Sequence, residues 1–248
     1  METPHDWDEF ASLYNAIQNE STLSIEEDVI AELRRQHLLP AITVMDLASG
    51  SGRFALPLAQ YSDKVILLDW SKEMLRLAQQ AAANAQITNL TYRVADWRTL
   101  PKAPQAELVF INQLPTLAPS NLAHVTHLAQ HAVALNHQVK QDDTLLTAIY
   151  QWLKQPVPRP YQVDPDLMHQ YADWLTAHHF TFTATSFTYT RTEQTSIADL
   201  LPDIDHAFSL SSAQQLAEAL TGQSNPNALT ETTITYQYQL LTWLSEQH

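Results

Sequence analysis

The chain contains no cysteine among its 248 residues, and it contains no long apolar run. Without cysteine there can be no disulfide, no thiolate metal ligand and no cysteine nucleophile, which fits a protein of a reducing compartment. No stretch approaches the roughly 18 consecutive apolar residues that a membrane-spanning helix needs. The first ten residues carry no Lys or Arg, so they do not resemble a secretory signal. We therefore expect a soluble, cytoplasmic protein.

Basic residues are also scarce. The 13 Lys and Arg stand against 27 Asp and Glu, which gives a formal net charge of −14, and the longest basic run is the pair Arg34-Arg35. Binding to a phosphate backbone needs clustered basic side chains. The composition therefore argues against a nucleic-acid partner, and the apolar pattern argues against a membrane partner.

Most of the chain alternates between strand-like and helix-like segments. Strands are expected at residues 43–47, 65–68, 90–94, 107–111 and 144–150, and helices at residues 25–37, 54–61, 71–85 and 120–135. Several of the strands are continuously apolar, as expected of central parallel strands covered on both faces. The pattern predicts an α/β fold with a mostly parallel sheet.

The C-terminal part of the sequence changes character. Prolines at positions 156, 158, 160 and 165 precede a helix expected around residues 167–175, and residues 180–191 and 232–241 are rich in β-formers. Apolar and polar side chains alternate along residues 232–241, which indicates a half-buried antiparallel strand. We expect one domain over residues 1–248, with a helical cap at 1–40, a core at 41–150 and a helical insertion at 192–230.

Two of the chain's three glycines, Gly50 and Gly52, lie directly after the first expected strand. Glycine tolerates positive φ and has no Cβ, so a turn built from it lets a ligand approach the backbone at a helix N-terminus. A tight turn without a ligand would look the same in the sequence. The residues at the next strand ends favour the ligand.

Asp69 ends the second strand, where nucleotide-binding α/β folds place a carboxylate that accepts hydrogen bonds from ribose hydroxyls. Asp96 and Trp97 follow the third strand, so a carboxylate for an amino group and an indole for the π-face of a base stand together. Each feature alone could be a helix-start acid or a core aromatic. Three strand ends in series point to a nucleoside-containing cofactor.

These segments, Val44 to Arg53, Leu67 to Leu75 and Ala95 to Trp97, resemble the class I S-adenosylmethionine-dependent methyltransferases. The resemblance is close over roughly residues 41–112 and rests on element order elsewhere. It implies a Rossmann-like, doubly wound, mostly parallel seven-stranded sheet with an antiparallel C-terminal strand, and S-adenosylmethionine as cofactor. The cofactor residues that it implies are Asp46, Ala48, Ser49, Gly50, Ser51, Gly52, Asp69, Trp70, Met74, Asp96, Trp97 and Asn112.

The resemblance also implies a role for each part of this set. The turn from Ala48 to Gly52 would lie against the methionine part, Asp69 would hold the ribose, and Trp70 and Met74 would flank the adenine. Asp96 would accept the adenine amino hydrogens, and Asn112 would border the sulfonium. Tyr14, on an N-terminal helix with aromatics at helical spacing, is a candidate for a residue that covers the cofactor.

One departure from the family pattern is Ala48, where glycine is more frequent. Alanine fits there if its φ is negative. Residues 50–55 also satisfy the dinucleotide pattern that allows alanine last, with Asp69 about twenty residues onward, so binding of NAD or a flavin is the main competitor. The acid inside the first strand, the Asp96-Trp97 pair and the long N-terminal segment favour the methyltransferase.

The sequence identifies neither the methyl acceptor nor a catalytic base. We expect a small-molecule acceptor, selected by residues 192–230, because this segment has no Lys or Arg and its acids suit a neutral or cationic molecule. A catalytically silent protein that binds the cofactor as a sensor is the alternative. His124, His127 and His131 share one face of the expected 120–135 helix, but this face points to solvent, so we expect no metal there.

Overall fold

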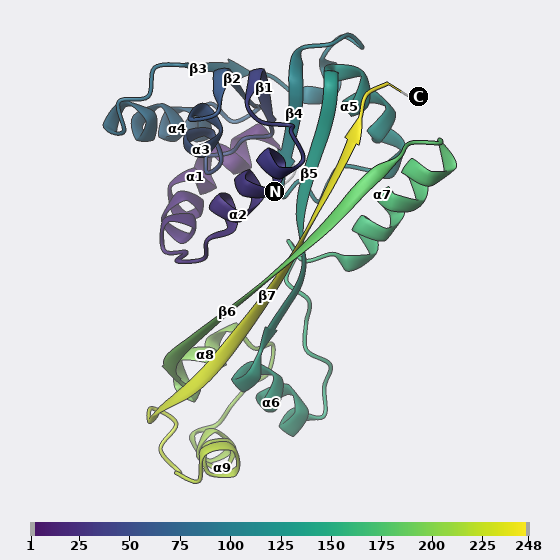
Figure 1. Ribbon diagram of the computed structural model, residues 1–248. Coiled ribbons are helices and arrows are strands. Elements are labelled where there is room, and N and C mark those ends of the chain that lie inside the picture. The colour runs from purple at the N-terminus through teal and green to yellow at the C-terminus, as the bar shows by residue number, and fades with distance from the viewer. Residues whose placement is uncertain (1–2, 247–248) are drawn as a thin grey trace. The chain divides into compact units, whose positions relative to one another are not determined.

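The computed structural model describes residues 3–246, which form a seven-stranded sheet of order β3-β2-β1-β4-β5-β7-β6 (Figure 1). Parallel pairs join β1 to β2 and β4, β2 to β3, and β4 to β5, whereas β7 is antiparallel. This is the predicted Rossmann-like sheet. The strands are β1 (Ala41–Leu47), β2 (Ser62–Asp69), β3 (Leu90–Val94), β4 (Ala106–Asn112), β5 (Ala129–Asp143), β6 (Phe182–Ser196) and β7 (Leu229–Leu244).

Helices flank the sheet and connect its strands. They are α1 (Pro4–Asn19), α2 (Ile25–Arg35), α3 (Ala55–Ala59), α4 (Lys72–Asn84), α5 (Leu122–Leu128), α6 (Thr144–Leu153), α7 (Pro165–Ala177), α8 (Ile197–Leu200) and α9 (Leu210–Thr221), with short 3-10 turns η1 (Trp97–Thr99), η2 (Pro119–Asn121) and η3 (Leu201–Asp203). Among residues 3–246, no helix is both long and apolar enough to cross a membrane.

The described residues separate into two compact units. The first contains residues 3–137, 164–187 and 239–246, and its core is built on the buried central strands, with Val44, Leu67 and Phe110 fully buried. The apolar runs of β1, β2 and β4 explain this core, because parallel strands in the middle of a sheet are covered on both faces. The strands β5, β6 and β7 run from the first unit into the second.

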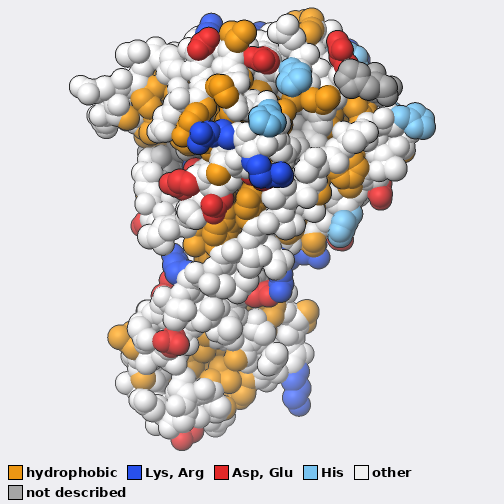
Figure 2. All heavy atoms as spheres, in the orientation of Figure 1, with side chains coloured by type: hydrophobic (Ala, Val, Ile, Leu, Met, Phe, Trp, Pro, Cys, Tyr) orange, Lys and Arg blue, Asp and Glu red, His pale blue; other side chains and the backbone are white. Residues whose placement is uncertain are grey.

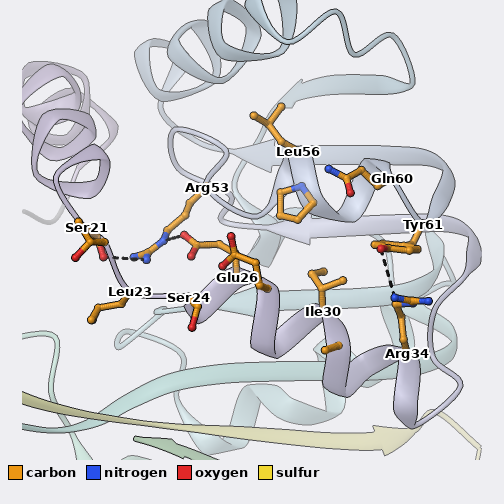
Figure 3. Close-up of a pocket in the computed structure, with 14 residues that line it drawn as sticks. Ser21, Leu23, Ser24, Glu26, Ile30, Arg34, Arg53, Leu56, Gln60 and Tyr61 are labelled. Carbon is orange, nitrogen blue, oxygen red and sulfur yellow. Dashed lines mark hydrogen bonds and ion pairs between the residues drawn. The ribbon is translucent and has the colours of Figure 1, made fainter. Parts of the chain in front are cut away.

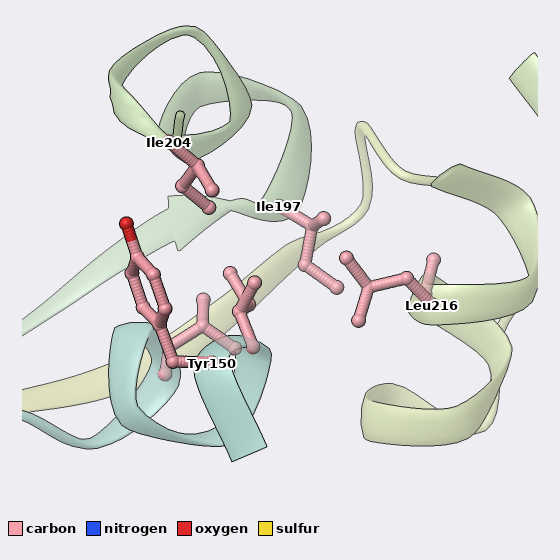
Figure 4. Packing of buried hydrophobic residues seen from close by; sticks show 7 residues of the cluster. Tyr150, Ile197, Ile204 and Leu216 are labelled. Carbon is pink, nitrogen blue, oxygen red and sulfur yellow. The ribbon is translucent and has the colours of Figure 1, made fainter. Parts of the chain in front are cut away.

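The second unit contains residues 138–163 and 188–238 and has a hydrophobic cluster of its own (Figure 4). Tyr150 of α6, Ile197 of α8 and Leu216 of α9 are among its buried members. The predicted insertion at 192–230 lies wholly within this unit. The unit also contains residues 138–163 and parts of β5, β6 and β7. The sequence analysis expected one domain over the whole chain.

Two predicted elements are wrong. The helix expected at 120–135 ends at Leu128, and residues 129–143 form β5. The alanine-rich segment has high helix propensity, but the buried position beside β4 favours strand pairing. The strand expected at 144–150 is the helix α6, which begins where the Asp143 side chain accepts hydrogen bonds from the Leu145 and Leu146 amides.

Candidate cofactor site

The site begins at the turn that follows β1. Gly50 and Gly52 have φ values of +53° and +84°, and a Cβ placed on Gly52 would lie 2.8 Å from the Cβ of Ala78 on α4. Real Cβ atoms do not approach so closely, so position 52 requires glycine on both conformational and steric grounds. The turn therefore holds its backbone close against α4.

The condition for an unstrained alanine at position 48, a negative φ, is not met. The φ of Ala48 is +58°, in the left-handed region that favours glycine. The Cβ of an L-residue is crowded there, and the cost is about 1 kcal/mol. Ala48 is therefore a strained residue at the end of β1, next to the turn.

Asp69 joins this turn to the end of β2. Its Oδ2 accepts a 2.8 Å hydrogen bond from the Gly50 amide, and its Oδ1 accepts a 2.8 Å hydrogen bond from the Ser71 amide. The residue is only 6% exposed. Because each carboxylate oxygen has further lone pairs, Asp69 can accept the hydrogen bonds from Gly50 and Ser71 and still accept hydrogen bonds from a ligand.

Two carboxyl groups of the site are buried, and both have raised pKa values. Asp46 on β1 is 2% exposed, and its burial, with the negative charge of Asp69, raises its pKa to about 8. Burial also raises the pKa of Asp69, although the amides of Ser71, Gly50 and Trp70 act in the opposite direction. Desolvation disfavours the charged form of both groups. The buried interior of the site thus disfavours ionisation of Asp46 and Asp69 at the same time.

The helix α1 places Tyr14 against the turn. A Cβ placed on Gly50 would lie 3.6 Å from Cε1 of the Tyr14 ring, which also contacts Trp7 and Phe10 edge to face or tilted at centroid distances of 5.7 and 6.0 Å. Burial raises the pKa of the Tyr14 hydroxyl; the positive charge of Arg53 acts in the opposite direction, and the charges of Asp69 and Asp46 act in the same direction as burial. Tyr14 therefore belongs to the same cluster as the two acids.

Asp8 is a residue of this site that the sequence did not identify. Its Oδ1 accepts hydrogen bonds from the Ser71 hydroxyl at 2.7 Å and from the Glu73 amide at 3.1 Å. A carboxylate at a helix N-terminus is favourable because it meets unpaired amides. Asp8 thereby attaches α1 to the start of α4. In the sequence, Asp8 stands among the aromatic residues of an expected helix, and no local pattern marks it as a residue of the site.

The residues predicted around an adenine base occupy different environments. Asp96 follows β3 and forms an ion pair with Arg98 at 2.7 Å, which lowers the pKa of Asp96. The Arg98 guanidinium lies 5.5 Å from the centre of the Trp70 ring, which is partly exposed. Trp97 and Met74 are buried.

Asn112 ends β4 and pairs with a neighbour that the sequence analysis overlooked. Asn136 of β5 lies opposite Asn112 in the parallel register and donates a 2.9 Å hydrogen bond from Nδ2 to its Oδ1. The Oδ1 of Asn136 and the Oγ of Ser49 are buried and have no hydrogen-bond partner among the described residues. Unpaired polar atoms of this kind cost about 1–3 kcal/mol each unless a ligand or water pairs with them.

A pocket of about 680 Å³ lies beside the turn, between α2 and residues 53–61 (Figure 3). At one end Arg53, the residue after Gly52, forms an ion pair with Glu26 and lies 3.5 Å from the Ser21 hydroxyl. At the other end the Arg34 guanidinium lies 4.4 Å from the centre of the Tyr61 ring. This pocket could not be predicted from the sequence, because its residues come together only through packing of α2 on α3.

The three histidines expected on one helix face do not share one. His124 and His127 lie on α5, whereas His131 lies on β5. Within residues 3–246, no group of three or more His, Cys, Asp or Glu side chains is arranged to hold a metal ion.

Residues 44–138 match a family model described as a methyltransferase domain. This segment spans β1 to β5 and contains the turn, Asp69 and the strand ends described above. Residues 44–138 are therefore similar to methyltransferase domains, and the seven-stranded sheet is the Rossmann-like fold that the sequence predicted.

Solved structures share this fold at low sequence identity. The YcgJ protein of Bacillus subtilis is 11% identical with a TM-score of 0.57, and the match covers 90% of this chain and all of that one. Magnesium protoporphyrin IX methyltransferase of Synechocystis PCC 6803, with bound S-adenosylhomocysteine, is 19% identical with a TM-score of 0.55, covering 95% of this chain and 96% of that one.

A curated relative matches over a shorter stretch. An uncharacterized protein of Mycobacterium tuberculosis is 39% identical over 64 residues, which is 26% of this chain and 23% of that protein. The alignment thus spans about a quarter of the relative's length.

Proposed function

We propose that this protein binds S-adenosylmethionine at the carboxyl ends of β1 to β4 and transfers its methyl group to a small molecule. The observation that carries the proposal is the Asp69 carboxylate, which is buried at the end of β2 and accepts a hydrogen bond from the amide of Gly50. In nucleoside-binding α/β folds a carboxylate at this position accepts hydrogen bonds from the ribose hydroxyls. Structural neighbours with bound S-adenosylhomocysteine support the choice of cofactor.

The residues present fit such a cofactor. The unpaired Oγ of Ser49 lies just after β1, and the unpaired Oδ1 of Asn136 lies on β5 beside the end of β4, where a polar ligand would pair with them. The turn over Ser49, Gly50, Ser51 and Gly52 would hold the methionine part, with Ala48 and Asp46 supporting it from β1. The amides of Gly50 and Gly52 already donate to Asp69 and to the Ser49 carbonyl, so the glycines would serve the cofactor by letting it approach the backbone of the turn closely.

The remaining contacts would fall on the adenosine part and on the methyl group. Asp69 would hold the ribose, Asp96 would accept the adenine amino hydrogens, and Asn112 would border the sulfonium. The aromatic and apolar side chains Trp70, Met74 and Trp97 would lie around the adenine. Tyr14, held by α1, would cover the cofactor and keep water out.

The bound cofactor supplies an electrophilic methyl group on a sulfonium. The protein's contribution to such a displacement is to hold the acceptor in line with the methyl group, which can lower the barrier by several kcal/mol, up to about 7–11. An acceptor amine has only to arrive unprotonated, whereas a hydroxyl acceptor needs its proton removed.

The charge of the molecule supports a small acceptor in place of a nucleic acid. On the face drawn in Figure 2, the basic side chains of the described residues are scattered among acidic and histidine side chains. Two solved neighbours, the magnesium protoporphyrin IX methyltransferase and a precorrin-6y methyltransferase of Geobacter metallireducens, are named for small-molecule substrates. We extend this substrate class to the present chain as a proposal.

Selection of the acceptor by residues 192–230 stays a prediction. Replacing the whole segment by a turn would remove α8 and α9 and leave the apolar side of α6 without its packing partners. Substitutions of exposed acids in the segment, such as Asp203→Asn and Asp205→Asn, are the cleaner test. They should change methyl transfer to the acceptor without changing cofactor affinity.

Calorimetry with three ligands tests the proposal. We expect binding of S-adenosylmethionine and S-adenosylhomocysteine but not of NAD. Asp69→Ala should weaken binding of the sulfur ligands by about 1.5–3 kcal/mol, because charge-assisted hydrogen bonds are lost. Asp63→Ala, at the exposed start of the same strand, is the matched control and should bind normally.

Two results would contradict the proposal. Binding of NAD without binding of either sulfur ligand would indicate an oxidoreductase. Wild-type affinity in Asp69→Ala would remove Asp69 from the cofactor contacts. A tritium label on the methyl group, followed into a deproteinised metabolite extract, separates an enzyme from a protein that only binds the cofactor.

A further inference from the structure

The pocket between α2 and residues 53–61 lies outside the contacts that we assign to the cofactor. Its volume of about 680 Å³ is within the range of roughly 300–1,000 Å³ that small-molecule sites occupy. All residues that line it lie between positions 21 and 61, so the pocket belongs wholly to the first compact unit. The cavity therefore does not depend on the second unit.

One end of the pocket is electrically neutral. Glu26 and Arg53 form an ion pair there, and both side chains are only 19% exposed. The Ser21 hydroxyl lies 3.5 Å from the Arg53 guanidinium. Because the two charges cancel, this end offers little attraction to a charged ligand.

The other end carries a positive charge that no carboxylate neutralises. The Arg34 guanidinium lies over the Tyr61 ring, and its Nη1 donates a 3.4 Å hydrogen bond to the Tyr61 hydroxyl (Figure 3). Arg34 is exposed and forms no ion pair with any of the described residues. Other arginines of the chain do form ion pairs: Arg35, Arg53, Arg76, Arg98 and Arg191. Since a guanidinium has five N–H groups, Arg34 can hold Tyr61 and still donate to a ligand.

Apolar side chains lie between these two ends. Ile30 of α2 lies between Glu26 and Arg34 (Figure 3), and Leu56 and Pro57 of α3 line the same pocket. The pocket therefore has a cationic end and an apolar middle.

Glu27 also lines the pocket, and its charge opposes an anionic ligand. It is about two turns of α2 away from Arg34, or about 10 Å along the helix axis. That distance exceeds the Debye length of about 8 Å at physiological ionic strength, and Glu27 is exposed to solvent. The attraction of Arg34 for an anion is therefore largely retained.

We propose that this pocket binds a small organic anion, with a carboxylate on the Arg34 guanidinium and an apolar body along Ile30, Leu56 and Pro57. Arginine presents its N–H groups in a fork that matches the two oxygens of a carboxylate. The apolar body would extend from Arg34 toward the Glu26–Arg53 ion pair. The site is separate from the cofactor contacts, so its test does not depend on binding of S-adenosylmethionine.

Octanoate and octanamide are the probes, because they share an eight-carbon chain and differ in charge. Binding to the full-length protein is measured by calorimetry at physiological ionic strength. Octanoate should bind at least about ten-fold more tightly than octanamide, the order expected of a hydrogen bond to a charged group. The formal net charge of −14 repels anions in general, so such a preference would indicate a local cationic site.

Arg34→Gln should weaken octanoate binding at least about ten-fold and change octanamide binding by less than about two-fold. The matched control is Arg93→Gln, which removes the same charge. Arg93 is exposed on β3, where its Nη1 donates to the side-chain oxygen of Gln105 at 3.3 Å, far from the pocket in the sheet order. It should bind octanoate like the wild type.

A second variant tests the cavity itself. Ala31 is an exposed residue of α2 that lines the pocket, so Ala31→Trp should fill the space without disturbing the core. This variant should weaken binding of both probes at least about ten-fold, and urea unfolding should show that it is folded.

Three results would overturn the proposal. One is the absence of octanoate binding to the wild type at concentrations up to about 10 mM. Another is an equal loss of octanoate affinity in Arg34→Gln and Arg93→Gln, which would indicate a general effect of charge. The third is octanoate binding that survives in folded Ala31→Trp, which would place the bound anion outside the pocket.

Discussion

Replacing Gly52 by alanine is the sharpest test of the turn after β1. The residue has a φ of +84°, and the added Cβ would lie 2.8 Å from the Cβ of Ala78 and 3.3 Å from Cδ2 of Leu67. The closest atom is attached directly to the backbone of α4, so it cannot rotate away. Relief of the overlap requires α4 or the turn to move.

The magnitude follows from two contributions. An alanine in the left-handed region costs about 1 kcal/mol more than glycine, and overpacking a close contact costs typically about 1–3 kcal/mol. Gly52→Ala should therefore lower the free energy of unfolding by about 2–4 kcal/mol. Because the same turn would contact the cofactor, affinity for S-adenosylhomocysteine should fall as well.

The chain's other two glycines separate these contributions. Gly50 has a φ of +53° with only an ordinary contact at 3.6 Å, and Gly222 has a φ of +73° with no atom within 4 Å of an added Cβ. Alanine at either position should cost about 1 kcal/mol, from conformation alone.

Urea unfolding followed by tryptophan fluorescence and by circular dichroism measures all three variants. The two signals are compared because the two compact units need not unfold together. If Gly52→Ala is as stable as Gly50→Ala, the close contact with α4 contributes nothing to the destabilisation, and position 52 does not require glycine on steric grounds.

Three further predictions concern acids of the first unit. Hydrogen bonds from Arg35 and two other partners lower the pKa of Glu32 from 4.5 to about 2. Glu32→Gln should therefore destabilise the protein by about 1–3 kcal/mol at pH 7. In urea titrations, the difference in unfolding free energy between wild type and variant should fade as pH falls from 4.5 toward 2. The pH dependence expected for Asp46 is the opposite. Because its pKa is raised to about 8, the wild type loses stability as pH rises from 3.8 to 8. The stabilisation by Asp46→Asn should therefore grow over that range in the same titrations. Asp8→Ala should release α1, seen as faster amide hydrogen exchange over residues 4–19 with unchanged exchange in β1.

The strands and the glycine turn of the first half could be predicted because their signals are local. The apolar runs of β1, β2 and β4 are short and bounded, and each is followed by a glycine or a polar residue at the strand end. Parallel neighbours then bring those ends to one edge of the sheet, so Asp69 and Gly50 were expected near each other before their hydrogen bond was seen.

The φ of Ala48 could not be read in the same way. Its sequence position admits either sign of φ, and the left-handed value depends on how the turn meets β2, where the Ser49 amide donates to the Leu68 carbonyl. Asp8 and Asn136 were missed for a related reason. Their partners are 63 and 24 residues away in the sequence, and no local pattern marks an acid or an amide that is bonded at such a distance.

The error at residues 120–135 has a consequence for the site. With a helix continuing past Leu128, Asn136 and His137 would have followed a helix end and would have had no defined relation to Asn112. As part of β5, Asn136 lies beside the end of β4, because the pairing of the two strands runs to Asn112 and Asn136. Alanine-rich segments are ambiguous between helix and buried strand when only periodicity is considered. Here the burial of seven successive residues, 132–138, resolves the ambiguity, since one face of a helix at the surface would have stayed exposed. Three polar side chains, Asn136, His137 and Gln138, end that buried run, and their positions are therefore determined by the sheet and not by a helix.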